Sequence, residues 1–96
     1  MEITPQTKLV QDKELFASEL DSEIVLLSMK SEKYFGMGNL EKEIWHQFAD
    51  SASVEEICPR LVEDYDVDLE TCTADVLKFV QRLYDRQLLE AVEVPV

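Results

Sequence analysis

The sequence predicts a small α+β domain in which a three-stranded antiparallel sheet is followed by three helices. Residues 15–37 contain short runs rich in β-branched and aromatic residues, separated by polar turns. Residues 39–89 instead place apolar residues at the spacing of amphipathic helices. The chain has 96 residues, the size of one domain, and its 46% of apolar and 31% of charged residues are typical of globular proteins.

The first two predicted strands form a hairpin. LFASEL, residues 15–20, alternates loosely between apolar and polar residues, and IVLLSM, residues 24–29, is an apolar run of strand length. A second polar turn, residues 30–33, leads to KYFGM, residues 33–37. This segment is short and aromatic, and its glycine makes a helix unfavourable. We expect this third strand to lie at the edge of the sheet, because the chain leaves it at once for helices.

Two of the three predicted helices have recognisable beginnings in the middle of the chain. Asn39 is a good N-cap for the first, whose apolar face includes Trp45 and Phe48. Ser53 opens the second with a capping box. Pro59 lies too deep in that helix to be a first-turn proline, so we expect the helix to be kinked or split into two short pieces.

Asp68 caps the third and longest helix, which is expected to end near Leu88 and Leu89. Residues 1–13 are polar and are interpreted as a flexible or weakly ordered N-terminal arm, with at most a weak first strand. Residues 91–96 are interpreted as a C-terminal tail, so residues 14–90 form the domain. A small sheet with three helices is also one way to build a winged helix-turn-helix domain.

The charge of the chain argues against a nucleic-acid partner. Its 21 acidic and nine basic residues give a net charge of −12, whereas proteins usually hold phosphate backbones with clusters of lysine and arginine. Lys78, Arg82 and Arg86 on the third helix are interspersed with acidic residues, so the helix does not stand out as basic. The sequence also lacks a run of about 20 apolar residues and a secretory signal, which predicts a cytoplasmic protein without a membrane partner.

Catalytic chemistry has little support in the sequence. Cys58 and Cys72 have no CxxC spacing and His46 is the only histidine, so the cysteines are interpreted as small buried thiols and not as metal ligands. We find no Gly-rich phosphate loop and no plausible set of nucleophile, base and orienting residue. We therefore expect a protein that is not an enzyme and that uses no cofactor.

Three segments together resemble the PqqD-like family, whose members are recognition elements for the leader peptides of ribosomally made, post-translationally modified peptides. The segments are IVLLSMKSEKYFGMGNLEKEIWHQF, SVEEICPRLVEDYDVD and DVLKFVQRLYDRQLLE, and the resemblance covers residues 15–90. The KYFGM strand leading to EIW is similar to stand-alone members that work with lasso-peptide leader peptidases. The chain departs from the family pattern at Gly38–Leu40, where an Asn-Pro step is frequent, and at Gln87, where glycine is frequent.

This resemblance implies recruitment without catalysis. A precursor leader peptide would add as an extra strand to the third strand, lie against the third helix, and be delivered to a separate leader peptidase or other modifying enzyme. An exposed edge strand suits this role, because its unpaired N–H and C=O groups can be satisfied by an incoming strand. The implied peptide-binding residues come from the third strand and one side of the third helix: Lys33, Tyr34, Phe35, Gly36, Met37, Asp75, Val76, Phe79, Val80 and Leu83.

Both glycines of the chain lie beside the third strand. Gly36 would let another backbone approach closely, and Gly38 would permit a sharp exit from strand to helix. Tyr34 and Phe35 must point to opposite faces of the sheet. The sequence leaves open which of the two faces the groove.

Two other functions compete with peptide recognition. The first is an acidic carrier protein, which would tether its substrate on a serine at the start of a helix. Ser51, just before the second helix, weakly resembles such a serine. Against this function, the large apolar residue expected after the serine is missing, and a carrier is all-helical. A generic winged-helix module for protein interaction, or one that binds DNA, would share the predicted fold but not the peptide ligand.

Overall fold

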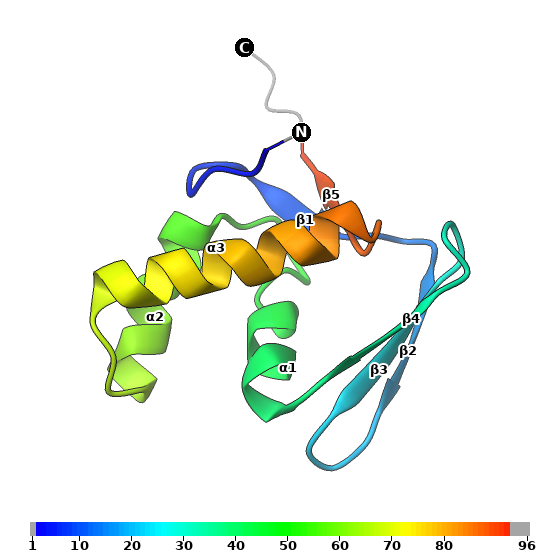
Figure 1. The fold of residues 1–96 in the computed structure, drawn as a ribbon, viewed down its shortest axis with the longest axis horizontal. Helices are drawn as coiled ribbons and strands as arrows, with labels where there is room; N and C mark the ends of the chain where they lie inside the picture. The colour runs from blue at the N-terminus through cyan, green and yellow to red at the C-terminus, as the bar shows by residue number, and fades with distance from the viewer. Residues whose placement is uncertain (1, 93–96) are drawn as a thin grey trace.

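The computed structural model describes residues 2–92 and follows the predicted order of sheet and helices (Figure 1). Two further short strands flank these elements. The complete order is β1 (Leu9–Gln11), β2 (Leu15–Glu19), β3 (Ile24–Ser28), β4 (Tyr34–Met37), α1 (Asn39–His46), α2 (Val54–Asp64), α3 (Leu69–Asp85) and β5 (Leu89–Ala91).

The antiparallel sheet has the order β2-β3-β4, so the predicted edge position of β4 is confirmed. Its register places Leu26 opposite both Ala17 and Phe35. Alternate residues therefore share a face. One face is buried against the helices through residues that β3 and β4 contribute to the core: Ile24, Leu26, Phe35 and Met37. The sheet extends away from the helices at one end of the molecule, as Figure 1 shows.

The structure settles the orientation of the two aromatic residues of β4. Phe35 is 7% exposed and faces the helices, whereas Tyr34 is 72% exposed on the outer face of the sheet. The register aligns Tyr34 with Leu27, and Leu27 with Phe16, so the outer face carries an apolar row. Phe35 is thus the residue that reaches the helix side.

The first helix begins one residue earlier than expected. Gly38 is its N-cap, with an ordinary φ of −79°, and Asn39 is the first helical residue. The Gly38 N–H donates to Glu41 Oε1 at 3.1 Å, but glycine has no side chain to accept the N–H groups of the first turn, as the expected Asn39 cap would have done. Because its φ is ordinary, Gly38 does not supply the unusual backbone conformation that the sequence suggested.

The second helix is continuous across Pro59, so the expected division into two pieces is wrong. The predicted capping box is present: Ser53 Oγ accepts the Glu56 N–H at 3.3 Å, and the Ser53 N–H donates to Glu56 Oε1 at 3.1 Å. Ile57 and Leu61, on either side of the proline, are buried in the core. This shared buried face keeps both sides of the proline packed in the core, although the proline removes one helical hydrogen bond.

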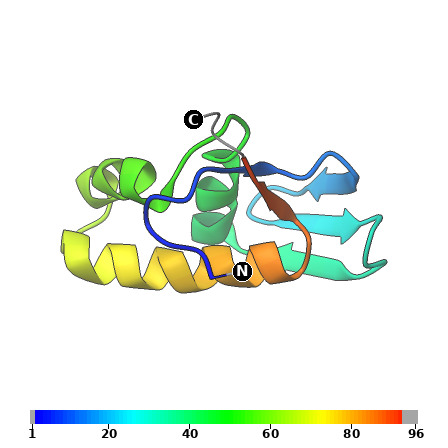
Figure 2. The same ribbon diagram turned by 90° about the horizontal axis from the view of Figure 1, so that it is seen from above.

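The third helix is the longest and packs against α2 (Figure 2). Its predicted cap, Asp68, accepts the Thr71 N–H at 3.1 Å, and hydrogen bonds from the Thr71 side chain and backbone hold the pKa of Asp68 below its usual value. After Asp85 the chain turns through Gln87, whose φ of 62° lies in the left-handed region. That turn brings Leu88 and Leu89 back into the core.

Residues near the start of the chain are more ordered than the expected arm. β1 pairs antiparallel with β5, and Ile3 is 3% exposed in the core. Leu9 also exchanges two backbone hydrogen bonds with Ala52, at 2.8 and 2.9 Å. The weak first strand thus exists as β1. Its partner β5 comes from the other end of the chain, so no pattern within neighbouring residues could predict the pairing. Residue 1 of the expected arm and residues 93–96 of the expected tail lie outside the described residues.

Candidate functional site

One edge of β4 carries unpaired backbone groups. The Ser28 N–H donates to the Lys33 carbonyl at 3.1 Å, and the register continues this pairing through Phe35 and Met37. Hydrogen-bonded and non-hydrogen-bonded residues alternate in an antiparallel ladder. Tyr34 and Gly36 therefore direct their N–H and C=O groups away from β3, toward an edge that no strand of residues 2–92 covers.

Nothing within the described chain requires a glycine at position 36. A Cβ atom built there meets no atom within 4 Å, and the backbone φ is not positive. Gly36 is exposed, and by alternation its missing side chain would project from the outer face beside that of Tyr34. The absence of a side chain at this position leaves the middle of the free edge uncrowded.

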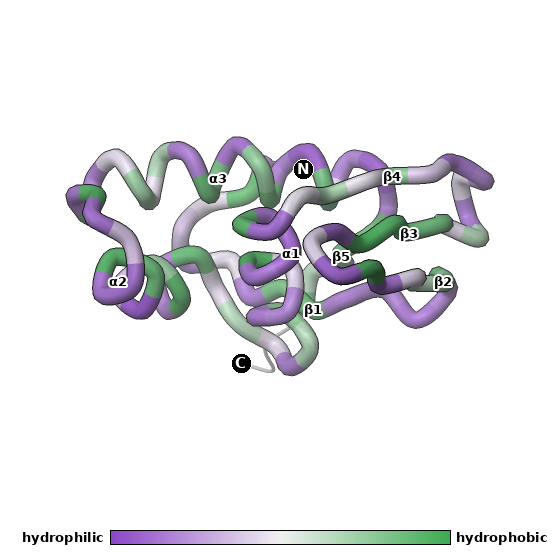
Figure 3. The backbone as a smooth tube through the Cα atoms, turned by 90° about the horizontal axis from the view of Figure 1, so that it is seen from below, coloured by the Kyte–Doolittle hydropathy of each residue, from purple (hydrophilic) through white to green (hydrophobic). Residues whose placement is uncertain are grey.

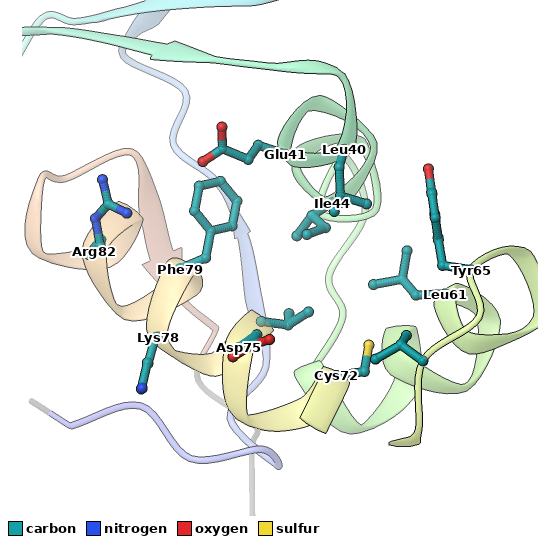
Figure 4. A pocket seen from close by; sticks show the side chains of 12 residues that line it. Leu40, Glu41, Ile44, Leu61, Tyr65, Cys72, Asp75, Lys78, Phe79 and Arg82 are labelled. Carbon is teal, nitrogen blue, oxygen red and sulfur yellow. The ribbon is translucent and has the colours of Figure 1, made fainter. Parts of the chain in front are cut away.

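A cavity of about 420 Å³ lies between the three helices, next to this edge (Figure 4). Apolar side chains predominate in its wall, and Leu40 and Val67 are exposed large apolar residues in that lining. Glu41, Asp75, Lys78 and Arg82 add charged groups. The complete lining is Leu40, Glu41, Ile44, Leu61, Tyr65, Val67, Cys72, Asp75, Val76, Lys78, Phe79 and Arg82.

The edge and the cavity adjoin through two aromatic rings. The centroids of Phe35 on β4 and Phe79 on α3 are 6.4 Å apart, and Phe79 lines the cavity. Figure 4 shows Phe79 between Glu41 and Arg82, below the strand that leads into α1. An extended chain placed along β4 would therefore run past Phe35 toward the cavity.

The predicted site residues divide into three groups in the structure. Asp75, Val76 and Phe79 line the cavity. Val80 and Leu83 are completely buried in the core and are absent from the lining. Lys33 is exposed just before β4, and within β4 (Tyr34–Met37) exposed and buried residues alternate.

Sequence reasoning missed the part of the cavity wall that lies outside α3. α1 contributes Leu40 and Ile44, and α2 with the following loop contributes Leu61 and Tyr65. In the sequence these residues could be recognised only as part of the apolar face of a helix. Core residues follow the same pattern, so the pattern could not identify them as lining a cavity. The Tyr65 hydroxyl donates to the Glu43 carboxylate, and this hydrogen bond raises the pKa of Tyr65.

The two cysteines are buried thiols, as the sequence predicted. Burial raises the pKa of Cys58 to about 11, which keeps the unreactive thiol form at neutral pH. Within residues 2–92 no three His, Cys, Asp or Glu side chains are grouped as a metal site would require. The helices in that same range are too short or too polar to cross a membrane.

Two solved structures share this fold. TbiB1, solved in complex with the TbiA(beta) leader peptide, superposes with a TM-score of 0.79 and 27% sequence identity, covering 88% of this chain and 99% of that one. The PqqD truncation of Methylobacterium extorquens PqqCD, described as a stand-alone recognition element for ribosomally synthesized and post-translationally modified peptides, gives a TM-score of 0.75. Its identity is 18%, covering 92% of this chain and 94% of the other.

A comparison with curated protein sequences gave no match. The family model described as coenzyme PQQ synthesis protein D (PqqD) matches residues 23–89, from the start of β3 to the start of β5. This range contains the β4 edge and every residue of the cavity wall. The chain therefore belongs to the PqqD family.

Proposed function

We propose that this protein binds the leader segment of a ribosomally made precursor peptide and delivers it to a separate maturation enzyme. That enzyme would be a leader peptidase or another modifying enzyme, and the protein itself would catalyse no step. The observation that carries the proposal is the unpaired edge of β4 directly beside an apolar cavity. The proposal places the protein in the cytoplasm, where ribosomes make the precursor.

The leader would bind by strand addition. Tyr34 and Gly36 each offer one N–H and one C=O at the free edge, so an added strand can form up to four backbone hydrogen bonds. These backbone bonds fix the position of the peptide but do not distinguish one peptide sequence from another. The choice of sequence would come from residues facing α3 and from an apolar side chain placed in the cavity, near Phe79 and Ile44.

The comparisons support this function from two directions. TbiB1, which is 27% identical to this chain over nearly its whole length, was solved with a leader peptide bound. The M. extorquens domain supports the fold of a recognition element that stands alone. The more specific form of the proposal is that this protein is a stand-alone partner of a lasso-peptide leader peptidase. It is motivated by the KYFGM segment, which is similar to that of family members that work with such peptidases.

The expected affinity is moderate unless further contacts contribute. Four strand hydrogen bonds at about 1 kcal/mol each and two or three apolar anchors at about 2 kcal/mol each give about 8 to 10 kcal/mol. Ordering a flexible peptide costs about 2 to 5 kcal/mol. The difference corresponds to binding at roughly millimolar to micromolar concentrations, so additional charged contacts would matter.

The structure argues against the acidic carrier protein. Such a carrier is all-helical, whereas this chain has a three-stranded sheet and a two-stranded one among its described residues. A generic protein-interaction module shares the fold, and it differs in having no preference for a leader peptide. The winged helix-turn-helix arrangement remains a prediction.

Fluorescence anisotropy tests the proposal. A labelled leader segment, taken from a short open reading frame beside the gene, is titrated with the protein at two salt concentrations. We expect saturable binding, which reaches the micromolar range or below when charged contacts add to the strand and anchor contacts, and which weakens when the apolar anchors of the leader are changed to alanine. A scrambled leader of identical composition is the control. Equal binding of both peptides, or of neither, would contradict leader recognition.

A further inference from the structure

Basic residues are concentrated on one side of α3, although the chain as a whole is strongly acidic. Three of the nine basic residues, Lys78, Arg82 and Arg86, lie four residues apart along this helix and its C-cap. Residues at this spacing share one face of a helix. The net charge of −12 therefore does not describe the surface that lies next to β4.

Two of these residues reach the strand. The guanidinium carbons of Arg82 and Arg86 lie 5.6 and 5.1 Å from the centroid of the Phe35 ring. A guanidinium at this distance is attracted to the negative face of an aromatic ring. Phe35 thus holds both positive groups over the helix-facing side of β4, where an added strand would place its own side chains.

Neither guanidinium has an acidic partner among residues 2–92. The ion pairs within that range are made by Lys8, Lys30, Lys42 and His46. Asp85 lies between the two arginines in sequence, but it accepts a hydrogen bond from the Gln81 side chain at 3.0 Å. Both arginines keep hydrogen-bond donors available to a ligand, since an aromatic ring occupies the face of a guanidinium and not its N–H edge.

The spacing of the two arginines matches that of alternate residues in a strand. Four residues of α-helix rise about 6.0 Å. Two residues of β-strand rise about 6.6 to 6.8 Å, and side chains at that separation lie on one face. Two side chains at positions i and i+2 of a strand on β4 can therefore each meet one guanidinium.

We propose that the bound peptide presents two carboxylates, from Asp or Glu at alternate positions, to Arg82 and Arg86. Carboxylates suit this position because arginine binds them through two parallel hydrogen bonds. The inference rests on the proposed function and specifies its ligand as an acidic segment next to an apolar anchor, in place of the basic ligand that the net charge would favour. Arg82 also lines the cavity, so one charged contact would lie beside the anchor.

The test uses the full-length protein and the labelled leader described above. In the protein, Arg82→Gln and Arg86→Gln are made singly and together. Arg60→Gln is the control, because Arg60 on α2 is exposed, absent from the cavity lining and, among residues 2–92, bonded only to Gln47. In the leader, acidic pairs at i and i+2 are changed to glutamine. Thermal unfolding confirms that each variant is folded.

We expect each arginine substitution to weaken binding about fivefold at low salt, and the double substitution more than tenfold, with a reduced dependence on salt. The Gln-x-Gln leader should bind the wild type as weakly as the original leader binds the double variant, and combining the two changes should add little further loss. Arg60→Gln should leave the affinity unchanged.

Different outcomes separate this inference from the function on which it rests. Tight binding of the leader that is insensitive to both arginines, or a bound leader segment without carboxylates, overturns the inference and leaves leader recognition intact. An equal loss in Arg60→Gln shows only a general charge effect and overturns the inference as well. No binding of the leader to the wild type overturns both.

Discussion

Gly36→Pro is the sharpest test of strand addition, because it changes a group that the folded protein does not use. The Gly36 N–H points to the free edge and takes no part in the pairing of β4 with β3. Proline is tolerated on an edge strand when the missing N–H faces solvent. We therefore expect the variant to fold with a β3–β4 ladder like that of the wild type.

The loss of peptide affinity can be worked from the same geometry. Gly36 offers an N–H and a C=O to an added strand, and the proline ring removes the donor and pushes the incoming backbone away from the neighbouring carbonyl. Two strand hydrogen bonds at about 1 kcal/mol each amount to about 2 kcal/mol. This free energy corresponds to binding that is weaker by roughly 30-fold.

Gly36→Ala is the matched control. It retains the N–H, and its Cβ would enter open space on the outer face, where no atom lies within 4 Å. Leader affinity, measured by anisotropy, should change less than about twofold for a change that leaves the edge groups in place. A folded Gly36→Pro variant with wild-type affinity would refute pairing at this edge, and an equal loss in Gly36→Ala would point to the outer face instead.

Three further predictions concern the folded state. Gln87→Gly should raise the free energy of unfolding in urea by about 1 kcal/mol, because Gln87 has a φ of 62°, and an unchanged urea midpoint would contradict this. Burial raises the pKa of Asp12, but hydrogen bonds from Lys30 and the backbone and the Lys30 charge outweigh it, so the net pKa is lowered. The stability this gives is present above the unfolded pKa and is lost as the pH falls through the folded one. Asp12→Asn should therefore destabilise the protein at pH 7 and flatten its acid unfolding curve, whereas an unaltered curve would show that the pair contributes nothing. Cys58, which is 0% exposed and has a pKa of about 11, should react with a thiol reagent only at the rate of unfolding, and rapid labelling of Cys58 in the folded protein would contradict its burial.

Local patterns were sufficient to predict the elements that form from neighbouring residues. The β2–β3–β4 meander followed from alternation and turn residues, and the caps of α2 and α3 followed from Ser53 and Asp68, since each signal lies within a few residues of its effect. The pairing of β1 with β5 left no such signal, because its partners come from opposite ends of the chain.

The candidate site was predicted only where it lies in one segment. The edge strand was recognisable because a short aromatic run directly preceded a helix. The cavity is formed by α1, α2 and α3 together, and the faces of the three helices do not reveal which apolar residues meet and which leave a space. For the same reason Val80 and Leu83 could not be distinguished from Phe79 before the packing was known.

The β1–β5 pair also determines how the domain comes apart under load. The β1 and β5 labels lie near each other in Figure 1 and in Figure 3. The register sets Leu9 opposite Ala91, and the Val92 N–H donates to the Lys8 carbonyl, so the chain enters and leaves this ribbon at the same end. Once residues 2–8 are detached, a force across the two ends opens the ribbon one residue pair at a time and does not shear all pairs together.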